Sequence, residues 1–462
     1  MSTTHSRAAK EFLKDQKYAK WHDATFWAVR SKRDNMAQGL DEWEQLREKA
    51  SAIKRHTITH LDEYLEEFSA NAEKNGAIVH WAKDAQEFNE IVYGILECHK
   101  VKKMVKSKSM LTEECEMNPY LEARGIEVVE TDLGERIIQL KGQKPSHIVM
   151  PAIHLNHDDV GELFEEKGIS NEKGNHDPTF LTYRARLSLR NEFLTADAGM
   201  TGGNFGIAKT GDIVVCTNEG NADMSTSCPK LHIAAIGLEK VIPDYACLAV
   251  FQRMLCRAGT GQPTTTYTSH FRKPRVVGAG PVPARGEYHI ILVDNGRSDW
   301  VANPEHWESL KCIRCGSCMN TCPVYRRSGG YSYSYFIPGP IGINLGMLRS
   351  PQEHSGNVSA CTLCNSCQTV CPVKINLGDQ IYLWRQQLAD FGTANPQKKL
   401  MCRAMSLLYG SSVLYDLGTS LAHWANALPS PLMNCGLNPW AEGHTMMEFP
   451  KKPFHEQIKD EQ

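Results

Sequence analysis

The sequence lacks the features of a secreted, membrane-spanning or nucleic-acid-binding protein. Its first residues, MSTTHSRAAKEFLKDQ, contain no apolar core and no small-residue cleavage site, so we expect no secretory signal. The least charged region, 417–441, contains His423, Asn426 and Pro429, which are costly in hydrocarbon. We therefore interpret it as amphipathic helix and loop, a candidate docking surface. A formal net charge of −2 gives no reason to expect nucleic acid or an anionic membrane as a partner.

Nucleotide-binding motifs are also missing. The glycine-rich stretch GMTGGNFGIAKTGDIVVCTNEGN, residues 199–221, has the wrong spacing for G-x-G-x-x-G, and no G-x-x-x-x-G-K-[ST] occurs. Nicotinamide, flavin and nucleotide sites therefore have no positive signal. We expect this stretch to form a loop before the strand 212–217. Tight turns between packed elements and a ligand pocket explain its glycines equally well.

Cysteine, by contrast, is abundant and patterned. Two near-copies of C-x2-C-x2-C-x3-C-P occur, CIRCGSCMNTCP at 312–323 and CTLCNSCQTVCP at 361–372. A chain of 462 residues needs no disulfide framework, and thiolate ligands need a reducing environment, so we expect a cytoplasmic protein. Eight further cysteines have no ligand-like spacing and are interpreted as small buried hydrophobic residues. They are Cys98, Cys115, Cys216, Cys228, Cys247, Cys256, Cys402 and Cys435.

The spacing of each cassette predicts a [4Fe–4S] cluster. In two-cluster ferredoxins the fourth cysteine of each run ligates the other cluster. Two structural zinc sites are the alternative, but zinc explains neither the third cysteine nor the proline after the fourth. The predicted ligands are Cys312, Cys315, Cys318 and Cys371 for the first cluster, and Cys361, Cys364, Cys367 and Cys322 for the second. The 38 residues between Cys322 and Cys361 resemble the connection in α-helical ferredoxin domains of succinate dehydrogenase and glycolate oxidase, which suggests a docked subunit.

The rest of the chain divides by pattern. Residues 1–75 predict a helical extension, 76–300 an α/β domain, 301–385 the two-cluster domain, and 386–462 a helical C-terminal region with a polar tail. Alternating strands and helices indicate a mostly parallel sheet, with ligands beyond the carboxyl ends of its strands. Strands are expected at 77–81, 102–107, 126–131, 147–152, 212–217, 231–237 and 288–294, and helices at 84–98, 112–124, 157–167, 180–196 and 244–257.

Several side chains near the expected strand ends are candidate site residues. Asp132, Glu135 and Glu219 are general acid or base groups only if burial raises their pKa; otherwise they are helix caps and surface charges. His154 and His157 form an H-x2-H pair that could ligate a metal, although a solvated loop or helix cap explains it more simply.

The segments SKSM, ETDLGE, PSHIVMPAIH, TGGNFGIAKTGD and TNEGN, in this order, resemble the LUD domain of lactate utilization proteins. With the twin cassettes behind them, the whole resembles the lactate utilization protein B family, from about residue 60 to residue 450. The resemblance implies an α/β fold similar to CoA-transferases and ribose-5-phosphate isomerase. It also implies a cytoplasmic component of a multi-subunit system that oxidises L-lactate to pyruvate for growth on lactate. The implied partners are a cysteine-rich-domain iron–sulfur protein and a smaller LUD protein, with any membrane contact made through a partner. Fold analogy makes Glu219 the first residue to test for contact with substrate.

Three functions follow from these patterns. The leading one is an iron–sulfur electron-transfer subunit, whose two clusters pass on the two electrons of lactate one at a time. The second places catalysis in the LUD domain itself and makes the clusters its internal electron drain. The third is a scaffold whose clusters only hold the C-terminal half together.

Overall fold

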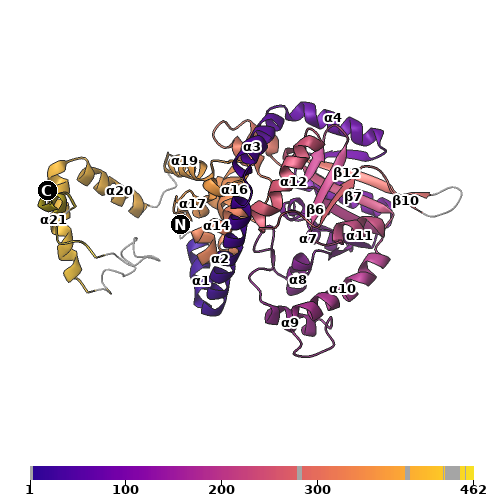
Figure 1. Cartoon of the computed structure of the whole chain (residues 1–462), viewed down its shortest axis with the longest axis horizontal. Coiled ribbons are helices and arrows are strands. Elements are labelled where there is room, and N and C mark those ends of the chain that lie inside the picture. The colour runs from indigo at the N-terminus through magenta and orange to yellow at the C-terminus, as the bar shows by residue number, and fades with distance from the viewer. Residues whose placement is uncertain are drawn as a thin grey trace.

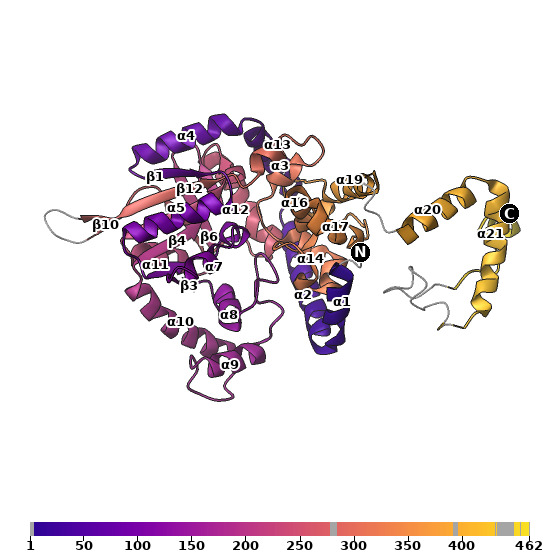
Figure 2. The same cartoon turned by 180° about the vertical axis from the view of Figure 1, so that it is seen from behind.

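The structure is a computed structural model of the chain. Both views show an α/β body beside a helical region that contains the N-terminal helices and the cysteine cassettes (Figures 1 and 2). The last helices extend away from this body. The structure describes residues 4–277, 284–390, 396–429, 431, 448–452 and 454–461.

A six-stranded parallel sheet, in the order β1-β12-β7-β4-β2-β3, forms the centre of the α/β body. The inner strand β7 is buried along its whole length, because its apolar run LHIAAIG is covered on both faces. The expected parallel sheet is confirmed. Its strands are β1 (Ile78–Ala82), β2 (Lys103–Lys106), β3 (Glu127–Glu130), β4 (Ala198–Gly202), β7 (Leu231–Gly237) and β12 (Glu287–Val293).

A second, four-stranded sheet has the order β8-β5-β6-β9, in which β6 is antiparallel to both of its neighbours. The prediction of a loop across the glycine-rich stretch is wrong for 198–202 and 205–207, which form β4 and β5, whereas 208–211 form turns directly before β6. A Cβ at Gly199 would lie 1.6 Å from the carbonyl oxygen of Ser225, so glycine lets the helix α11 (Asn221–Ser227) approach β4 closely. The strands are β5 (Phe205–Ile207), β6 (Asp212–Thr217), β8 (Val241–Ile242) and β9 (Tyr267–Phe271), with a separate hairpin of β10 (Val276–Val277) and β11 (Ala284–Arg285).

The predicted strand at 147–152 is also wrong. This segment is a series of turns in which the backbone N–H groups of Val149 and Met150 donate to the His147 ring nitrogen Nδ1, at 3.1 and 3.0 Å. Ile148 is buried in the same core as residues of the cysteine region. The β-rich pattern therefore reflects burial of a turn, with a side chain in place of a neighbouring strand as its hydrogen-bond partner.

Helices surround both sheets. The helix predicted at 112–124 is split into two, because Glu116 adopts a left-handed φ of 50° that ends the first piece. The other predicted helices of the α/β domain are present. They are α5 (Ala85–Cys98), α6 (Met110–Glu114), α7 (Met117–Glu122), α8 (Leu133–Lys141), α9 (His157–Glu166), α10 (Pro178–Thr195), α11 (Asn221–Ser227), α12 (Tyr245–Gly259) and α13 (Arg297–Val301).

The remaining helices lie at the two ends of the chain. Short helices follow the cysteines, and longer ones pack around them. These are α1 (Thr4–Lys14), α2 (Gln16–Gln38), α3 (Trp43–Thr59), α4 (Leu61–Lys74), α14 (Ser317–Thr321), α15 (Pro323–Ser328), α16 (Gly339–Arg349), α17 (Pro351–Ala360), α18 (Ser366–Val370), α19 (Leu377–Asp390), α20 (Pro396–Tyr409), α21 (Ser412–Ala422) and α23 (Phe454–Glu461).

One hydrophobic core joins these parts. It contains Phe26 of α2, Phe205 of β5, Phe251 of α12, Tyr325 of α15 and Ile341 of α16, all buried. The N-terminal helices therefore pack against both the α/β body and the cysteine region. The boundaries at 75, 300 and 385 stay predictions.

The C-terminal helices α20 and α21 leave apolar side chains exposed, including Leu407, Val413 and Leu417. α21 includes residues 417–422 of the segment expected to form amphipathic helix and loop, and the docking role of that segment stays a prediction. Residues 430 and 432–441 of that region, with Cys435, lie outside the described residues. Across the ranges that are described, none of the helices combines the length and the apolar composition needed to cross a bilayer.

Two glycine substitutions test the close packing of α11 on β4. Gly199→Ala forces a Cβ into the Ser225 carbonyl, so we expect the Tm to fall by about 5 °C or more. Gly94→Ala in α5 is the matched control, because a Cβ there meets nothing within 4 Å. It should leave the Tm unchanged or raise it by about 1–3 °C through higher helix propensity. Thermal unfolding followed by circular dichroism measures both, and equal Tm values for the two variants would contradict the observed packing.

Candidate functional site

The two cysteine cassettes share one backbone form. Arg314 and Leu363 hold the same place between the first two cysteines, with left-handed φ angles of 60° and 55°. Gly316 and Asn365, each directly after the second cysteine, are left-handed as well, at 81° and 56°. The short helices α14 and α18 begin at the next residue in each case. The repeat seen in the sequence is therefore a structural repeat.

The first three cysteines of one cassette meet the last cysteine of the other. Cys312, Cys315 and Cys318 line one small pocket, and Cys371 lines it with them. Apolar side chains, including Ile341, form the rest of its wall. This grouping is the one expected from the exchanged pattern of two-cluster ferredoxins.

Cys322, in turn, is close enough to cysteines of the second cassette to interact with them electrostatically. Burial, and then the charges of Cys361 and Cys364, raise the pKa of the Cys322 thiol to about 11. The same two charges, together with that of Cys322, act on Cys367, whose pKa is also raised mainly by burial. The two groups adjoin, since α14 packs against α18.

The donor set fits iron–sulfur clusters. Soft thiol groups converge in a largely apolar surrounding, and burial raises the pKa of Cys322 to about 11 and that of Cys371 to about 12. Backbone N–H groups already point at the sulfur atoms. Arg314 donates to Cys312 Sγ and Leu363 to Cys361 Sγ, each at 3.3 Å. Hydrogen bonds of this kind stabilise cluster thiolates and tune the reduction potential. In the part of the chain that the structure describes, no three His, Cys, Asp or Glu side chains converge closely enough to hold a single metal ion.

The two groups differ in depth. Cys312, Cys315, Cys318 and Cys371 are all buried. In the second group Cys364 is exposed and Cys361 is partly buried. The first group therefore lies inside the molecule, and the second reaches the surface.

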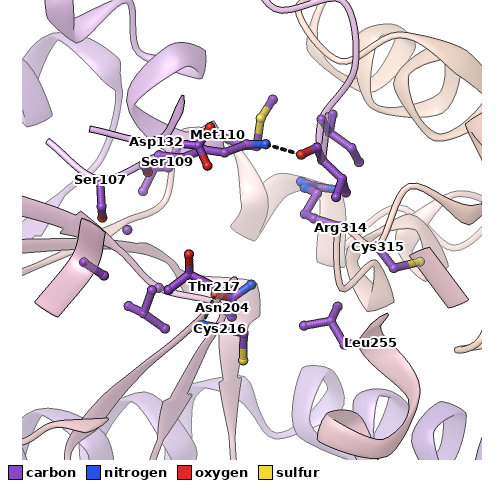
Figure 3. A pocket seen from close by; sticks show the side chains of 18 of the residues that line it. Ser107, Ser109, Met110, Asp132, Asn204, Cys216, Thr217, Leu255, Arg314 and Cys315 are labelled. Carbon is purple, nitrogen blue, oxygen red and sulfur yellow. Dashed lines mark hydrogen bonds between the residues drawn. The ribbon is translucent and has the colours of Figure 1, made fainter. Parts of the chain in front are cut away.

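A cavity of about 360 Å³ lies next to the first group, at the carboxyl ends of the strands. Its lining includes the residues that directly follow β2, β4 and β6, and Gly237 at the end of β7, as expected for a ligand site of an α/β sheet. Figure 3 shows Ser107, Ser109 and Thr217 on the sheet side of this cavity, and Arg314 and Cys315 of the first cassette on the opposite side. Its volume is that of a small-molecule site.

Two of the three acidic candidates line this cavity. Burial, and then the nearby charge of Asp132, raise the pKa of Glu219 to about 7. Glu219 also accepts a hydrogen bond from the backbone N–H of Leu133, at 3.1 Å. Asp132 caps α8 by accepting from the backbone N–H of Glu135. Glu135 is buried outside the cavity lining, and burial raises its pKa.

The structure does not bring His154 and His157 together as a metal-binding pair. The His154 ring interacts with Ser146 Oγ at 2.9 Å and with Gln143 Oε1 at 3.1 Å. The His157 ring lies 3.3 Å from Asp158 at the start of α9. The simpler interpretation, a loop and a helix terminus, describes both positions.

Sequence reasoning missed the charged side chains between the cavity and the first cysteine loop. Arg297 is buried and pairs with both Glu114, at 2.8 Å, and Glu239. Lys240 Nζ donates to the carbonyl oxygen of Cys312, at 3.2 Å. These residues come from distant parts of the chain, and only Arg314 could have been suggested by its place inside a cassette.

Of the eight other cysteines, Cys216 and Cys256 line the cavity, and burial raises the pKa of Cys256 to about 11. Cys115 is also buried, whereas Cys98 and Cys402 are exposed, so the expectation of buried small side chains is wrong for those two.

Comparisons with known proteins agree with the two-part architecture. The LUD domain family model matches residues 65–293, and that of the 4Fe-4S dicluster domain matches residues 308–375. "Lactate utilization protein B" of Geobacillus kaustophilus is 40% identical over 440 residues, covering 93% of this chain and 90% of its own. The protein of the same name from Shouchella clausii is 40% identical over 396 residues, which cover 85% of this chain and 82% of that protein. "Uncharacterized electron transport protein YkgF" of Escherichia coli K12 is 36% identical over 440 residues, covering 94% and 92%.

The predicted fold class is confirmed: an α/β LUD domain with a parallel sheet lies between a helical N-terminus and a helical 4Fe-4S dicluster region. The identity extends over most of the chain and most of each relative. The chain therefore belongs to the lactate utilization protein B family.

Proposed function

We propose that the chain is the iron–sulfur electron-transfer component of a multi-subunit system that oxidises L-lactate to pyruvate. The carrying observation is the pair of adjoining cysteine groups, one buried and one open to the surface. Such an arrangement suits a path for electrons from inside the molecule to a partner. The names of the relatives, lactate utilization protein B and an electron transport protein, support the same role.

In this proposal the chain holds two [4Fe–4S] clusters with exchanged ligands. The shared pocket supports Cys371 as the fourth ligand of the first cluster, beside Cys312, Cys315 and Cys318. The electrostatic neighbours of Cys322 support its place with the second cassette. Cys361, Cys364, Cys367 and Cys322 are then the second ligand set.

The chemistry supplied by bound clusters is the acceptance and release of single electrons. The chain's own residues position that chemistry and protect it. Apolar side chains exclude water from the first group. Backbone N–H groups stabilise negative charge on sulfur, and Lys240 and Arg314 place positive charge beside Cys312. These features favour the reduced, more negative state and should raise the potential of the first cluster.

The partners belong to the same proposal. Two electrons leave each lactate, and they must enter and leave this chain through other components or an acceptor. We propose a cysteine-rich-domain iron–sulfur protein and a smaller LUD protein as sister subunits, in the cytoplasm. The exposed apolar side chains of α20 and α21 are a candidate contact surface for one of them.

Anaerobic reconstitution tests the relay. We expect about eight iron atoms per chain, the EPR signal of reduced [4Fe–4S] clusters, and reversible redox cycling. Lactate turnover with an artificial acceptor should require the sister subunits. Bound zinc without iron would refute the proposal. Clusters that cannot be reduced and reoxidised reversibly would leave only the scaffold role. Lactate oxidation by the isolated chain would show that this subunit itself contains the catalytic site.

One observation favours a second candidate, catalysis in the LUD domain. The cavity at the strand ends contains Glu219, whose pKa of about 7 suits a general base, and it adjoins Cys315. Oxidation of a 2-hydroxy acid to a 2-oxo acid releases two protons, one from the hydroxyl group and one from C2, and two electrons. In this candidate Glu219 would accept the hydroxyl proton, Asp132 of the same lining would accept the proton from C2, and two clusters would each take one electron.

Under this second candidate, turnover should depend on the ionisation of Glu219. Only the carboxylate accepts a proton, so kcat/KM should rise as pH increases through about 7. Glu219→Gln should lower kcat/KM about 100-fold or more and abolish that rise. Glu113→Gln, outside the cavity lining, is the control. If Glu219→Gln retains both the rate and the pH profile, catalysis by Glu219 is contradicted while the relay is unaffected.

A further inference from the structure

The cavity in the α/β domain has two chemically different ends. At the end near the first cassette, three cations (Lys240, Arg297 and Arg314) face two carboxylates (Glu114 and Glu239). The cations outnumber the carboxylates at this end by one, and the Cys312 sulfur is a further negative partner of Arg314. The case for an anion in the cavity therefore rests on hydrogen-bond donors that the protein leaves unpaired, because a buried unpaired donor is costly.

A fourth cation, Lys108, also lines the cavity, and its Nζ donates to the carbonyl oxygen of Val149 at 2.8 Å. Among these four cations, Arg314 is the one with a buried nitrogen atom that lacks a hydrogen-bond partner in the described part of the chain. The Arg297 guanidinium donates hydrogen bonds to the Glu114 carboxylate and to one carboxylate oxygen of Glu239. The other Glu239 oxygen lies 3.5 Å from Arg314 Nη2, which is too long for a strong hydrogen bond. Arg314 Nη1 is buried and has no hydrogen-bond partner among the described residues. Figure 3 shows this side chain entering the cavity from the cysteine loop.

The cysteine loop does not require an arginine at this position. Leu363 occupies the equivalent place in the second cassette, with nearly the same φ and the same N–H to sulfur hydrogen bond. A leucine therefore supports the same turn. The two residues differ in their surroundings: Arg314 lines the cavity, whereas Leu363 does not.

The opposite end carries hydroxyl and acid groups. Ser107 is buried in the lining, and its Oγ has no hydrogen-bond partner within the described ranges. Glu219 and Asp132 lie in the same lining, and Glu219 holds a proton more readily than an ordinary carboxyl because of burial. A ligand that is negative at one end and carries a hydroxyl or keto oxygen toward the other matches these groups.

We propose that this cavity binds a small organic carboxylate of the 2-hydroxy or 2-oxo acid class, with Arg314 as the anchor of its carboxylate. A planar guanidinium forms paired hydrogen bonds with a carboxylate and would gain the partner that Nη1 lacks. The ligand would then lie between the strand ends and Cys315. The inference rests on the proposed lactate role for its choice of probes, and it gives this subunit direct contact with the acid.

Isothermal titration calorimetry on the anaerobically reconstituted full chain tests this site. L-lactate and pyruvate should bind. The neutral analogue L-lactamide should bind at least about tenfold more weakly than L-lactate. Arg314→Leu copies the residue of the second cassette, so it should keep the iron content while weakening both acids by about tenfold or more. Arg47→Leu is the matched control. Arg47 donates to the carbonyl oxygen of Cys371 at 3.0 Å, beside the same cysteine group, but it does not line the cavity.

The outcomes separate the alternatives. Unchanged affinity in Arg314→Leu, equal binding of lactamide, or no binding of either acid by the unsubstituted chain would each overturn the proposal. If Arg314→Leu fails to assemble clusters, Arg314→Lys decides instead, because loss of the paired geometry should still weaken binding, and unchanged affinity would overturn it. Equal weakening by Arg47→Leu would assign the effect to charge near the cluster and would also overturn the site. Clusters that cycle without any acid binding would leave the proposed relay intact.

Discussion

The contact between the first cysteine loop and the carboxyl edge of the sheet is the constraint on which the rest of the structure depends. Arg297, held by Glu114 and Glu239, is buried at this contact. Lys240 Nζ donates to the Cys312 carbonyl oxygen at 3.2 Å, and Asn320 Nδ2 donates to that of Gly259 at 2.7 Å. Removing one member of such a buried network leaves a charge unpaired, at a cost of about 3–5 kcal/mol, so the loop has one position relative to the sheet.

That position connects two features that would otherwise be independent. It places the buried cysteine group against the cavity, and it leaves the second group toward the surface. The N-terminal helices fix the same arrangement from outside, since Phe26 shares its core with α12 and α15. In the relay that we propose, this packing sets an electron path from the cavity to the surface, and the depth of each cysteine group gives the path its direction.

Much of this arrangement was predictable from local pattern. The cysteine spacing predicted the two groups, and apolar runs such as 231–237 predicted the inner strands, because both signals are contained in a few neighbouring residues. Signals that depend on distant residues were lost. Gly199 suggested a loop, although its real constraint is the Ser225 carbonyl oxygen. The 147–152 segment suggested a strand, although His147 supplies its hydrogen bonds. Glu219 was found by its place after a strand, whereas Arg314 gained its importance only from the cavity opposite it.

The most direct measurement is anomalous diffraction at the iron absorption edge from crystals of the anaerobically purified chain. The account predicts two compact iron sites, the first surrounded by Cys312, Cys315, Cys318 and Cys371 and close to the cavity, the second reaching the surface at Cys364. A first site ligated by Cys322 would contradict the exchange between cassettes. Zinc at either position, or a first site remote from the strand ends, would contradict the account as a whole.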